Sequence, residues 1–285
     1  MNPFNMKKLA QGTGRRGLVF GKWMLIACLT GAVVGAFSSL FARCMIWATG
    51  FFTEKGSISA WFLPVAGLLI VFLYRISGMG QDKGTNRIIQ SAGGEERVPL
   101  RLAPLIFLST ILTHLCGGSA GREGAALQIG GSLGDNLARL FRMDMDDRRV
   151  LVMCGMGAAF SAVFGTPMAA ALFPLEMVTV GMMYYSALVP CVVSSFVASQ
   201  FAAGMGIHPQ TFIVREIPSI AFDSVGKIIV VGIGCALVAI LFCRTMRLMA
   251  QWLPRLMPNA YVRVAVAGIV IAGASWLLGT QAYMG

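Results

Sequence analysis

Charged side chains are scarce in this sequence. Only 12% of its 285 residues are Asp, Glu, Lys or Arg, whereas 56% are hydrophobic, and soluble domains carry about 25% charged residues. A soluble fold of this size could not bury so much apolar surface, and such a composition also excludes a disordered chain or a coiled coil. The composition therefore predicts a membrane protein with the lipid bilayer as its surroundings.

Acidic residues are the rarer charged class, with 12 Asp and Glu against 23 Lys and Arg, a net charge of +11. The basic residues flank apolar runs instead of forming a stripe with stacking aromatics, so we expect no nucleic-acid partner. Residues 1–16 form a basic segment without acids, and Lys22 extends it. The positive-inside rule predicts a cytoplasmic N-terminus on a multi-pass protein of the cell membrane.

Patterns that bind metals or cofactors are missing. The sequence has two histidines, and none of its seven cysteines forms a CxxC pair. It contains no Walker A or HExxH sequence, and the GxGxxG match at 12–17 follows no strand and lies in no βαβ unit. We expect no metal and no cofactor.

Long charge-free runs mark the membrane segments. They are Trp23–Ala42, Gly56–Tyr74, Leu102–Gly121, Val150–Leu175, Met177–Val214, Ile228–Cys243 and Val264–Gly285. About twenty residues make one spanning helix, and several runs are longer or shorter than that or are broken by Gly and Pro. The predicted fold class is all-α, with about nine to eleven helices of unequal length, some of them tilted or ending inside the membrane.

A glycine-rich link at 117–124 is the strongest candidate site. It precedes a predicted helix over 125–141, in which Gly130 and Gly134 form a GxxxG pair that permits tight helix packing. The free N–H groups and positive dipole end of such a helix attract anions. Glu123 lies at that end, so its carboxylate could compete with an anion and act as a gate. A simple helix-capping role for Glu123 explains the spacing equally well.

Two further polar features interrupt the apolar runs. A loop containing Gly84, Thr85 and Asn86 precedes a short apolar stretch and could present N–H groups and a hydroxyl, although a polar surface turn explains it too. Glu176 is a lone carboxylate between apolar runs, and such carboxylates are usually functional or paired. It follows a small-residue link that ends at Pro167, which the pattern predicts to be the first residue of a helix. His114 is another candidate for a proton or polar role, with a buried structural histidine as the alternative.

The segments GSAGREG, QIGGS and GAAFSAVFGTPMAAALFPLEM resemble the CLC family of anion channels and transporters. The resemblance implies an inverted-repeat fold with tilted and re-entrant helices, a homodimer, and chloride or fluoride as the ion. It assigns the gating glutamate to Glu123. The backbone of the anion site is assigned to Gly121, Arg122, Gly124 and Ala125, the last of which replaces the family's usual proline. Thr85 is the best match to the hydroxyl of the first anion loop, though its surrounding sequence departs from the family's pattern.

The resemblance leaves the type of transport open. Glu176 matches the first of the family's paired glutamates, whereas Met177 stands where proton-coupled exchangers have the second. We expect a chloride channel or transporter; a fluoride/proton antiporter is the alternative. A first repeat over 17–213 and an incomplete second repeat over 214–285 suggest a truncated chain, so a non-transporting membrane fragment is a third reading. A membrane enzyme using Glu123 and His114 would need more polar partners than these runs offer.

Overall fold

The computed structural model describes residues 3–80, 82, 84–94, 96–178, 184–208, 222–279 and 284. Every regular element within these residues is helical, which confirms the all-α prediction, and the eleven α-helices match the upper end of the predicted range. The helices are α1 (Pro3–Lys55), α2 (Ser57–Ala60), α3 (Leu63–Ile76), α4 (Thr85–Ala92), α5 (Leu102–Leu115), α6 (Arg122–Leu140), α7 (Met145–Phe164), α8 (Pro167–Val178), α9 (Leu188–Gly204), α10 (Phe222–Leu256) and α11 (Ala260–Leu278), with a 3₁₀ turn, η1, at Tyr185–Ala187.

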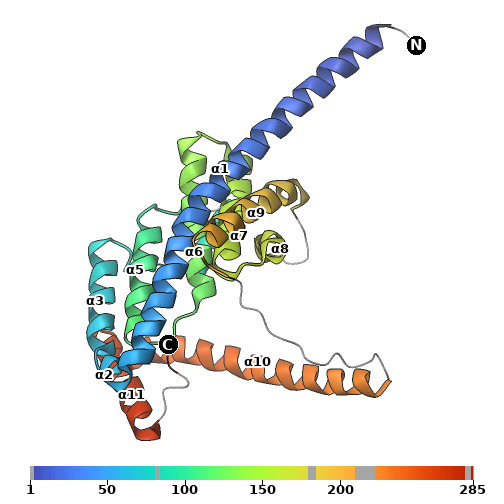
Figure 1. Ribbon diagram of the computed structural model, residues 1–285. Coiled ribbons are helices and arrows are strands. Elements are labelled where there is room, and N and C mark those ends of the chain that lie inside the picture. The colour runs from blue at the N-terminus through green and yellow to red at the C-terminus, as the bar shows by residue number, and fades with distance from the viewer. Residues whose placement is uncertain are drawn as a thin grey trace.

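The first helix is much longer than the apolar run that predicted it. α1 has 53 residues and forms one continuous rod, about 80 Å long at 1.5 Å per residue. Its apolar half packs against α9 at Gly31 and Gly35, where a side chain would collide with the α9 backbone. A methyl group at Gly31, for example, would lie 2.9 Å from Cα of Ser194. The short α2 then turns the chain, and α3 runs back beside α5, which separates it from α1 (Figure 1).

The α6–α7 pair forms the centre of the packed region. The predicted GxxxG contact is confirmed, because a methyl group at Gly130 would collide with the carbonyl oxygen of Gly155, and one at Gly134 with that of Leu151. Most of α7 is buried, and it also contacts α1, α8 and α9. Without Cβ atoms at these positions, the two helix backbones approach closely enough for dispersion contacts to hold them together in lipid.

Several helices are too short to cross a membrane. α4, α5 and α8 have 8, 14 and 12 residues, whereas about 20 are needed. Within the described part of the chain, five apolar helical spans are long enough to cross one, and two of them combine neighbouring elements, α2 with α3 and η1 with α9. α8 begins at Pro167 after Gly165, which has φ 71° and ends α7, so the predicted proline at the first helical position is confirmed. Short and long helices together give the predicted mixture of spanning and partly inserted segments.

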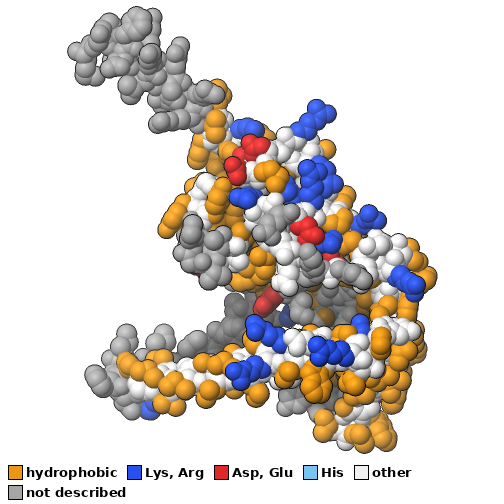
Figure 2. All heavy atoms as spheres, turned by 180° about the vertical axis from the view of Figure 1, so that it is seen from behind, with side chains coloured by type: hydrophobic (Ala, Val, Ile, Leu, Met, Phe, Trp, Pro, Cys, Tyr) orange, Lys and Arg blue, Asp and Glu red, His pale blue; other side chains and the backbone are white. Residues whose placement is uncertain are grey.

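The last two described helices differ in how they pack. α11 lies against α3, with Val264 over Gly67 and Pro64 over Gly268. α10 has 35 residues, and its side chains from Val225 to Leu256 are exposed. Figure 2 shows this helix as an arm covered mostly by hydrophobic side chains, with Lys and Arg side chains along it. The predicted boundary between two repeats, at 213–214, lies outside the described residues.

Candidate anion site

The glycine-rich link ends one helix and starts the next. Gly117, with φ 74°, and Gly118 donate to the last carbonyls of α5 and terminate it. Gly121 is the extended N-cap of α6, which begins at Arg122, three residues earlier than predicted. Glu123 therefore lies in the first turn, where helical N–H groups have no intrahelical acceptor and the dipole is positive. Its side chain is exposed, whereas Ala125 is buried.

The second candidate loop is also a helix start. Gly84 has φ 59° and is the N-cap of α4, so Thr85 is the first residue of this helix. Asp82 organises the turn: its Oδ2 accepts from the N–H of Gly84 at 3.0 Å, and its Oδ1 lies 3.2 Å from Nε of Arg87. The Thr85 hydroxyl is half-buried here, while Asn86 is exposed.

The fold brings these two helix starts together. A methyl group on Gly124 would lie 3.3 Å from Oγ1 of Thr85, which is close contact. Gln128, one turn into α6, donates from Nε2 to the carbonyl oxygen of Gly124 at 3.1 Å and to Oγ1 of Thr85 at 3.4 Å. The structure thus places Thr85, Gly124 and Gln128 in one site beside the first turn of α6. Sequence reasoning missed Gln128, although its position four residues after Gly124 puts it on the same helix face.

The remaining predicted residues lie apart from this contact. The Arg122 side chain lines a separate cavity of about 100 Å³ with Phe164 and His208, so only its backbone belongs to the helix start. His114 is buried in α5, and its Nδ1 lies 3.0 Å from the carbonyl oxygen of Thr110, as expected for the structural alternative. Glu176 is exposed near the end of α8.

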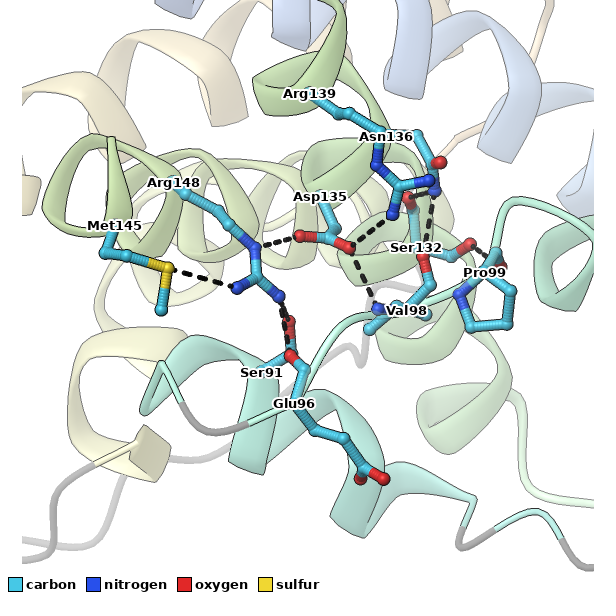
Figure 3. Close-up of polar contacts among 10 residues, drawn as sticks. All are labelled: Ser91, Glu96, Val98, Pro99, Ser132, Asp135, Asn136, Arg139, Met145 and Arg148. Atoms are coloured by element: carbon cyan, nitrogen blue, oxygen red, sulfur yellow. Dashed lines mark hydrogen bonds and ion pairs between the residues drawn. The ribbon is translucent and has the colours of Figure 1, made fainter. Parts of the chain in front are cut away.

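A buried polar cluster fixes α4 relative to α6 and α7 (Figure 3). Arg148 of α7 forms an ion pair through Nε with Oδ1 of Asp135, and both side chains are less than 10% exposed. The same guanidinium donates through Nη2 to Oγ of Ser91 in α4 at 3.0 Å and to the carbonyl oxygen of Glu96. The second oxygen of Asp135 accepts from the N–H of Val98 at 2.8 Å.

The linker between α4 and α5 is held at further backbone atoms. Asn136 donates to the carbonyl oxygen of Val98 at 3.1 Å, and Ser132 donates to that of Pro99 at 3.0 Å. Ile88 of α4 packs into the notch at Gly131 of α6. These contacts set the position of α4, and therefore of Thr85, on the face of α6. The sequence motifs include neither Asp135 nor Arg148; the available signal was an acid, Asp135, directly after Gly134 of the GxxxG pair in a predicted helix.

This chain is similar in sequence to known channels and transporters. The family model described as voltage gated chloride channel matches residues 67–285. The chloride/fluoride channel protein of Pseudomonas syringae pv. tomato is 37% identical over 264 residues, which cover 92% of this chain and 58% of that protein. This chain belongs to the voltage-gated chloride channel (CLC) family. The H(+)/Cl(-) exchange transporter ClcA of Citrobacter koseri is 32% identical over 180 residues, covering 57% of this chain and 38% of the transporter.

Solved structures share the architecture of this CLC chain. A CLC-type fluoride/proton antiporter matches with a TM-score of 0.88 and 28% identity, covering 93% of this chain and 67% of the antiporter. A slow cyanobacterial Cl-/H+ antiporter matches in fold with a TM-score of 0.71 and 19% identity, over 87% of this chain and 63% of that one. The chain is a multi-pass membrane protein of the CLC fold, and it spans 58% of the length of its Pseudomonas relative.

Proposed function

We propose that this CLC chain moves a halide ion across the membrane through a pathway gated by Glu123. The observation that carries the proposal is the contact between the starts of α4 and α6, where Thr85 faces Gly124. Two helix starts supply unpaired N–H groups and positive dipole ends at one place, and the Thr85 hydroxyl can donate to an anion. The backbone of Gly121, Arg122, Gly124 and Ala125, with Gly84 and Asn86 at the other loop, would complete this side of the site.

Glu123 is suited to gating because it is a tethered anion at the same positive potential. Its side chain is exposed in the first turn of α6 and is thus able to move. When ionised, it competes with a free halide for the helix start; when protonated, it leaves that place available. Anion flux should therefore depend on pH through this one carboxyl group.

The decisive test is anion efflux from liposomes containing the full chain, measured against pH. Glu123→Gln should give flux that no longer responds to pH, because the amide mimics the protonated acid. Glu54→Gln, which neutralises an exposed acid in the last turn of α1, is the matched control and should keep the wild-type response.

Three other outcomes separate the alternatives. A wild-type pH response in Glu123→Gln would overturn the gating role. Lower thermal stability with unchanged flux per folded protein would support the capping role. Efflux from wild-type liposomes no faster than from protein-free ones would support a non-transporting fragment.

Chloride is the proposed ion because the hydroxyl of Thr85 suits chloride coordination. The second candidate function is fluoride/proton antiport, because the structure of a CLC-type fluoride/proton antiporter matches this chain with a TM-score of 0.88. Ion-selective electrodes with a pH-sensitive dye inside the same liposomes distinguish them. Proton uptake driven by a fluoride gradient would identify the antiporter, whereas chloride efflux without proton movement would identify chloride transport.

Glu176→Gln tests the proposed proton role of Glu176. If Glu176 relays protons, this variant should slow proton movement and leave anion movement unchanged.

We further propose a cytoplasmic N-terminus. Lys22, Arg139 and Arg142 belong to the same end of the helix bundle, where α1 enters and α6 ends, and basic residues favour the cytoplasmic side. In intact cells, a membrane-impermeant thiol reagent should not label a cysteine introduced by Asn5→Cys. Adding Cys28→Ser to this variant, which removes a native cysteine of α1, should leave the result unchanged. Ready labelling of Asn5→Cys would reverse the orientation.

A homodimer is the proposed assembly, through the Val178–Phe201 side. Of this region, residues 179–183 lie outside the described residues, and α9 exposes Val189, Phe196 and Phe201. In lipid such a face associates by packing, so its shape matters more than its hydrophobicity. Chemical cross-linking in mild detergent should yield dimers, and Phe196→Trp should reduce their amount. An exclusively monomeric product would contradict the homodimer.

We also propose that the chain divides into a first repeat over 17–213 and an incomplete second repeat over 214–285.

A further inference from the structure

A chamber with basic and aromatic walls lies between the end of α3 and the start of α11. It has a volume of about 520 Å³ and is lined by Tyr74, Arg75, Asn259, Tyr261 and Arg263, together with apolar and glycine residues. None of the described residues that line it is acidic. The chamber can therefore offer two guanidinium groups, the phenol group of Tyr261 and one amide to a ligand that carries negative charge.

An apolar groove continues from this chamber. The two share Ile70 and Val71 as walls, and the groove, of about 280 Å³, runs between Ala66 on α3 and Ala267 and Ile271 on α11. It follows the helix pair away from the two arginines. A polar chamber joined to an apolar groove matches an amphiphile with a charged head and a hydrocarbon tail.

The chamber lies toward the end of the helix bundle from which α1 enters. α3 runs antiparallel to α1, so Arg75 in the last turn of α3 is on that side. Arg101, at the start of α5, donates to the carbonyl oxygen of Ser77 at 3.1 Å on the same side. Under the cytoplasmic N-terminus proposed above, on which this step rests, this is the cytoplasmic side, where basic pockets between transmembrane helices are typical sites for anionic lipid headgroups.

We propose that this groove binds an anionic phospholipid, with its phosphate between Arg75 and Arg263 and one acyl chain along α3 and α11. Tyr261 and Asn259 can bond to the ester and headgroup oxygens, whereas the Tyr74 hydroxyl is already hydrogen-bonded to Ser109. A choline headgroup would bring a cation into a chamber whose described walls hold two cations and no acid, so phosphatidylglycerol should bind better than phosphatidylcholine. The nearby acid Asp82 pairs with Arg87 at 3.2 Å.

Native mass spectrometry of the full chain in detergent tests this proposal, with phosphatidylglycerol and phosphatidylcholine as probes. Phosphatidylglycerol should remain bound at lower concentration. Arg75→Gln and Arg263→Gln should each weaken it about fivefold, since one basic residue near a lipid surface contributes about 1 kcal/mol. Arg263 also donates to the carbonyl oxygen of Met257 at 3.0 Å, so Arg263→Gln could weaken binding by disturbing the fold. Arg263→Lys keeps the positive charge and should therefore retain most of the lipid affinity.

Two matched controls sharpen the result. Arg255→Gln removes an exposed arginine of α10 that does not line the chamber, so lipid affinity should stay at the wild-type value. Ala267→Phe fills the apolar groove and should weaken a long-chain phosphatidylglycerol while sparing a dihexanoyl analogue. Inorganic phosphate at millimolar concentration should not displace the lipid; displacement would identify a free-phosphate site and overturn the proposal.

Equal affinity for the two lipids would overturn the proposal, as would an effect of Arg255→Gln equal to that of Arg75→Gln. Because binding is measured without ion flux, either result would leave the Glu123 gate standing. Conversely, a failed transport assay would leave the lipid site intact.

Discussion

The α6–α7 pair and α10 are both built from apolar, glycine-containing helices, yet they hold opposite places in the molecule. At α6–α7, glycine backbones touch, and Asp135 and Arg148 are buried beside the contact. On α10, Gly226, Gly232 and Gly234 each have open space where a side chain would begin, and the side chains around them are exposed. The same residue type thus permits close packing at α6–α7, whereas on α10 no described residue packs against these glycines.

This difference shows what lipid does and does not demand of a helix. A membrane helix satisfies its own backbone, so a helix such as α10 can form where lipid surrounds it. Hydrophobicity cannot draw two helices together in lipid, so α6 and α7 associate through surface shape and polar bonds. Substitutions should therefore be costly at α6–α7 and nearly silent at the corresponding positions of α10.

The largest effect is expected at the buried arginine. Arg148→Gln removes the buried ionic partner of Asp135, which keeps only the exposed Arg139 at 3.7 Å and the N–H of Val98, and it releases the bonds to Ser91 and Glu96. Breaking a buried ion pair from one side should cost about 3–5 kcal/mol of unfolding free energy. Arg247→Gln makes the same change on the exposed α10 and should cost less than about 0.5 kcal/mol. Unfolding in detergent measures both, and equal effects would remove the distinction between the two regions.

The next largest effect is expected at the glycine contact. Gly130→Ala puts a methyl group against the carbonyl oxygen of Gly155 and within 2.7 Å of Cβ of Ala159. Because backbone atoms cannot move aside cheaply, the overpacking should cost about 1–3 kcal/mol. Thermal unfolding of the purified protein measures the loss. An unchanged unfolding temperature would mean that α6 and α7 lie farther apart than described.

A smaller effect is expected for single hydroxyl groups. Ser132→Ala removes the donor to the carbonyl oxygen of Pro99 from a fully buried position, at a cost of about 1 kcal/mol. Thr245→Ala, on α10, removes an exposed hydroxyl that bonds only within its own helix, to the carbonyl oxygen of Leu241 at 2.9 Å. Its effect should be too small to resolve in the same unfolding assay; a loss equal to that of Ser132→Ala would indicate that α10 has a packing partner.

The smallest effect is expected at the open glycines. Gly232→Ala adds a methyl group where nothing lies within 4 Å, so the unfolding free energy should change by less than about 0.5 kcal/mol. The difference between the unfolding free energies of Gly232→Ala and Gly130→Ala, measured under identical conditions, shows how much the effect of one added methyl group depends on the atoms around it. A large destabilisation would show that a second helix covers α10 in the membrane.

Much of the local structure was predictable because it depends on short-range chemistry. Scarce charge and long apolar runs predicted an all-helical membrane protein, and GxxxG at Gly130 predicted a close helix contact. Pro167 marked a helix start, and the glycines before Glu123 marked another. Helix limits were less accurate: the charge-free run that predicted α1 ends before Arg43, whereas the helix continues past this arginine through further apolar residues to Lys55. The gating, topology and assembly predictions await the experiments above.

The sequence by itself determined which segments are apolar enough to enter the membrane. It also determined which links are too polar or too rich in glycine to be simple spanning helices. Both follow from the free energy of transferring side chains and backbone groups from water into lipid. Only the tertiary structure decided that Thr85 and Gly124 share a site, that Gln128 joins them, and that Asp135 and Arg148 hold α4 in place. The hydrogen bonds that join α4, α6 and α7 link residues 13 to 57 positions apart in the chain. Their contacts arise from the angle and depth at which α4, α6 and α7 pack, and no local pattern encodes that geometry.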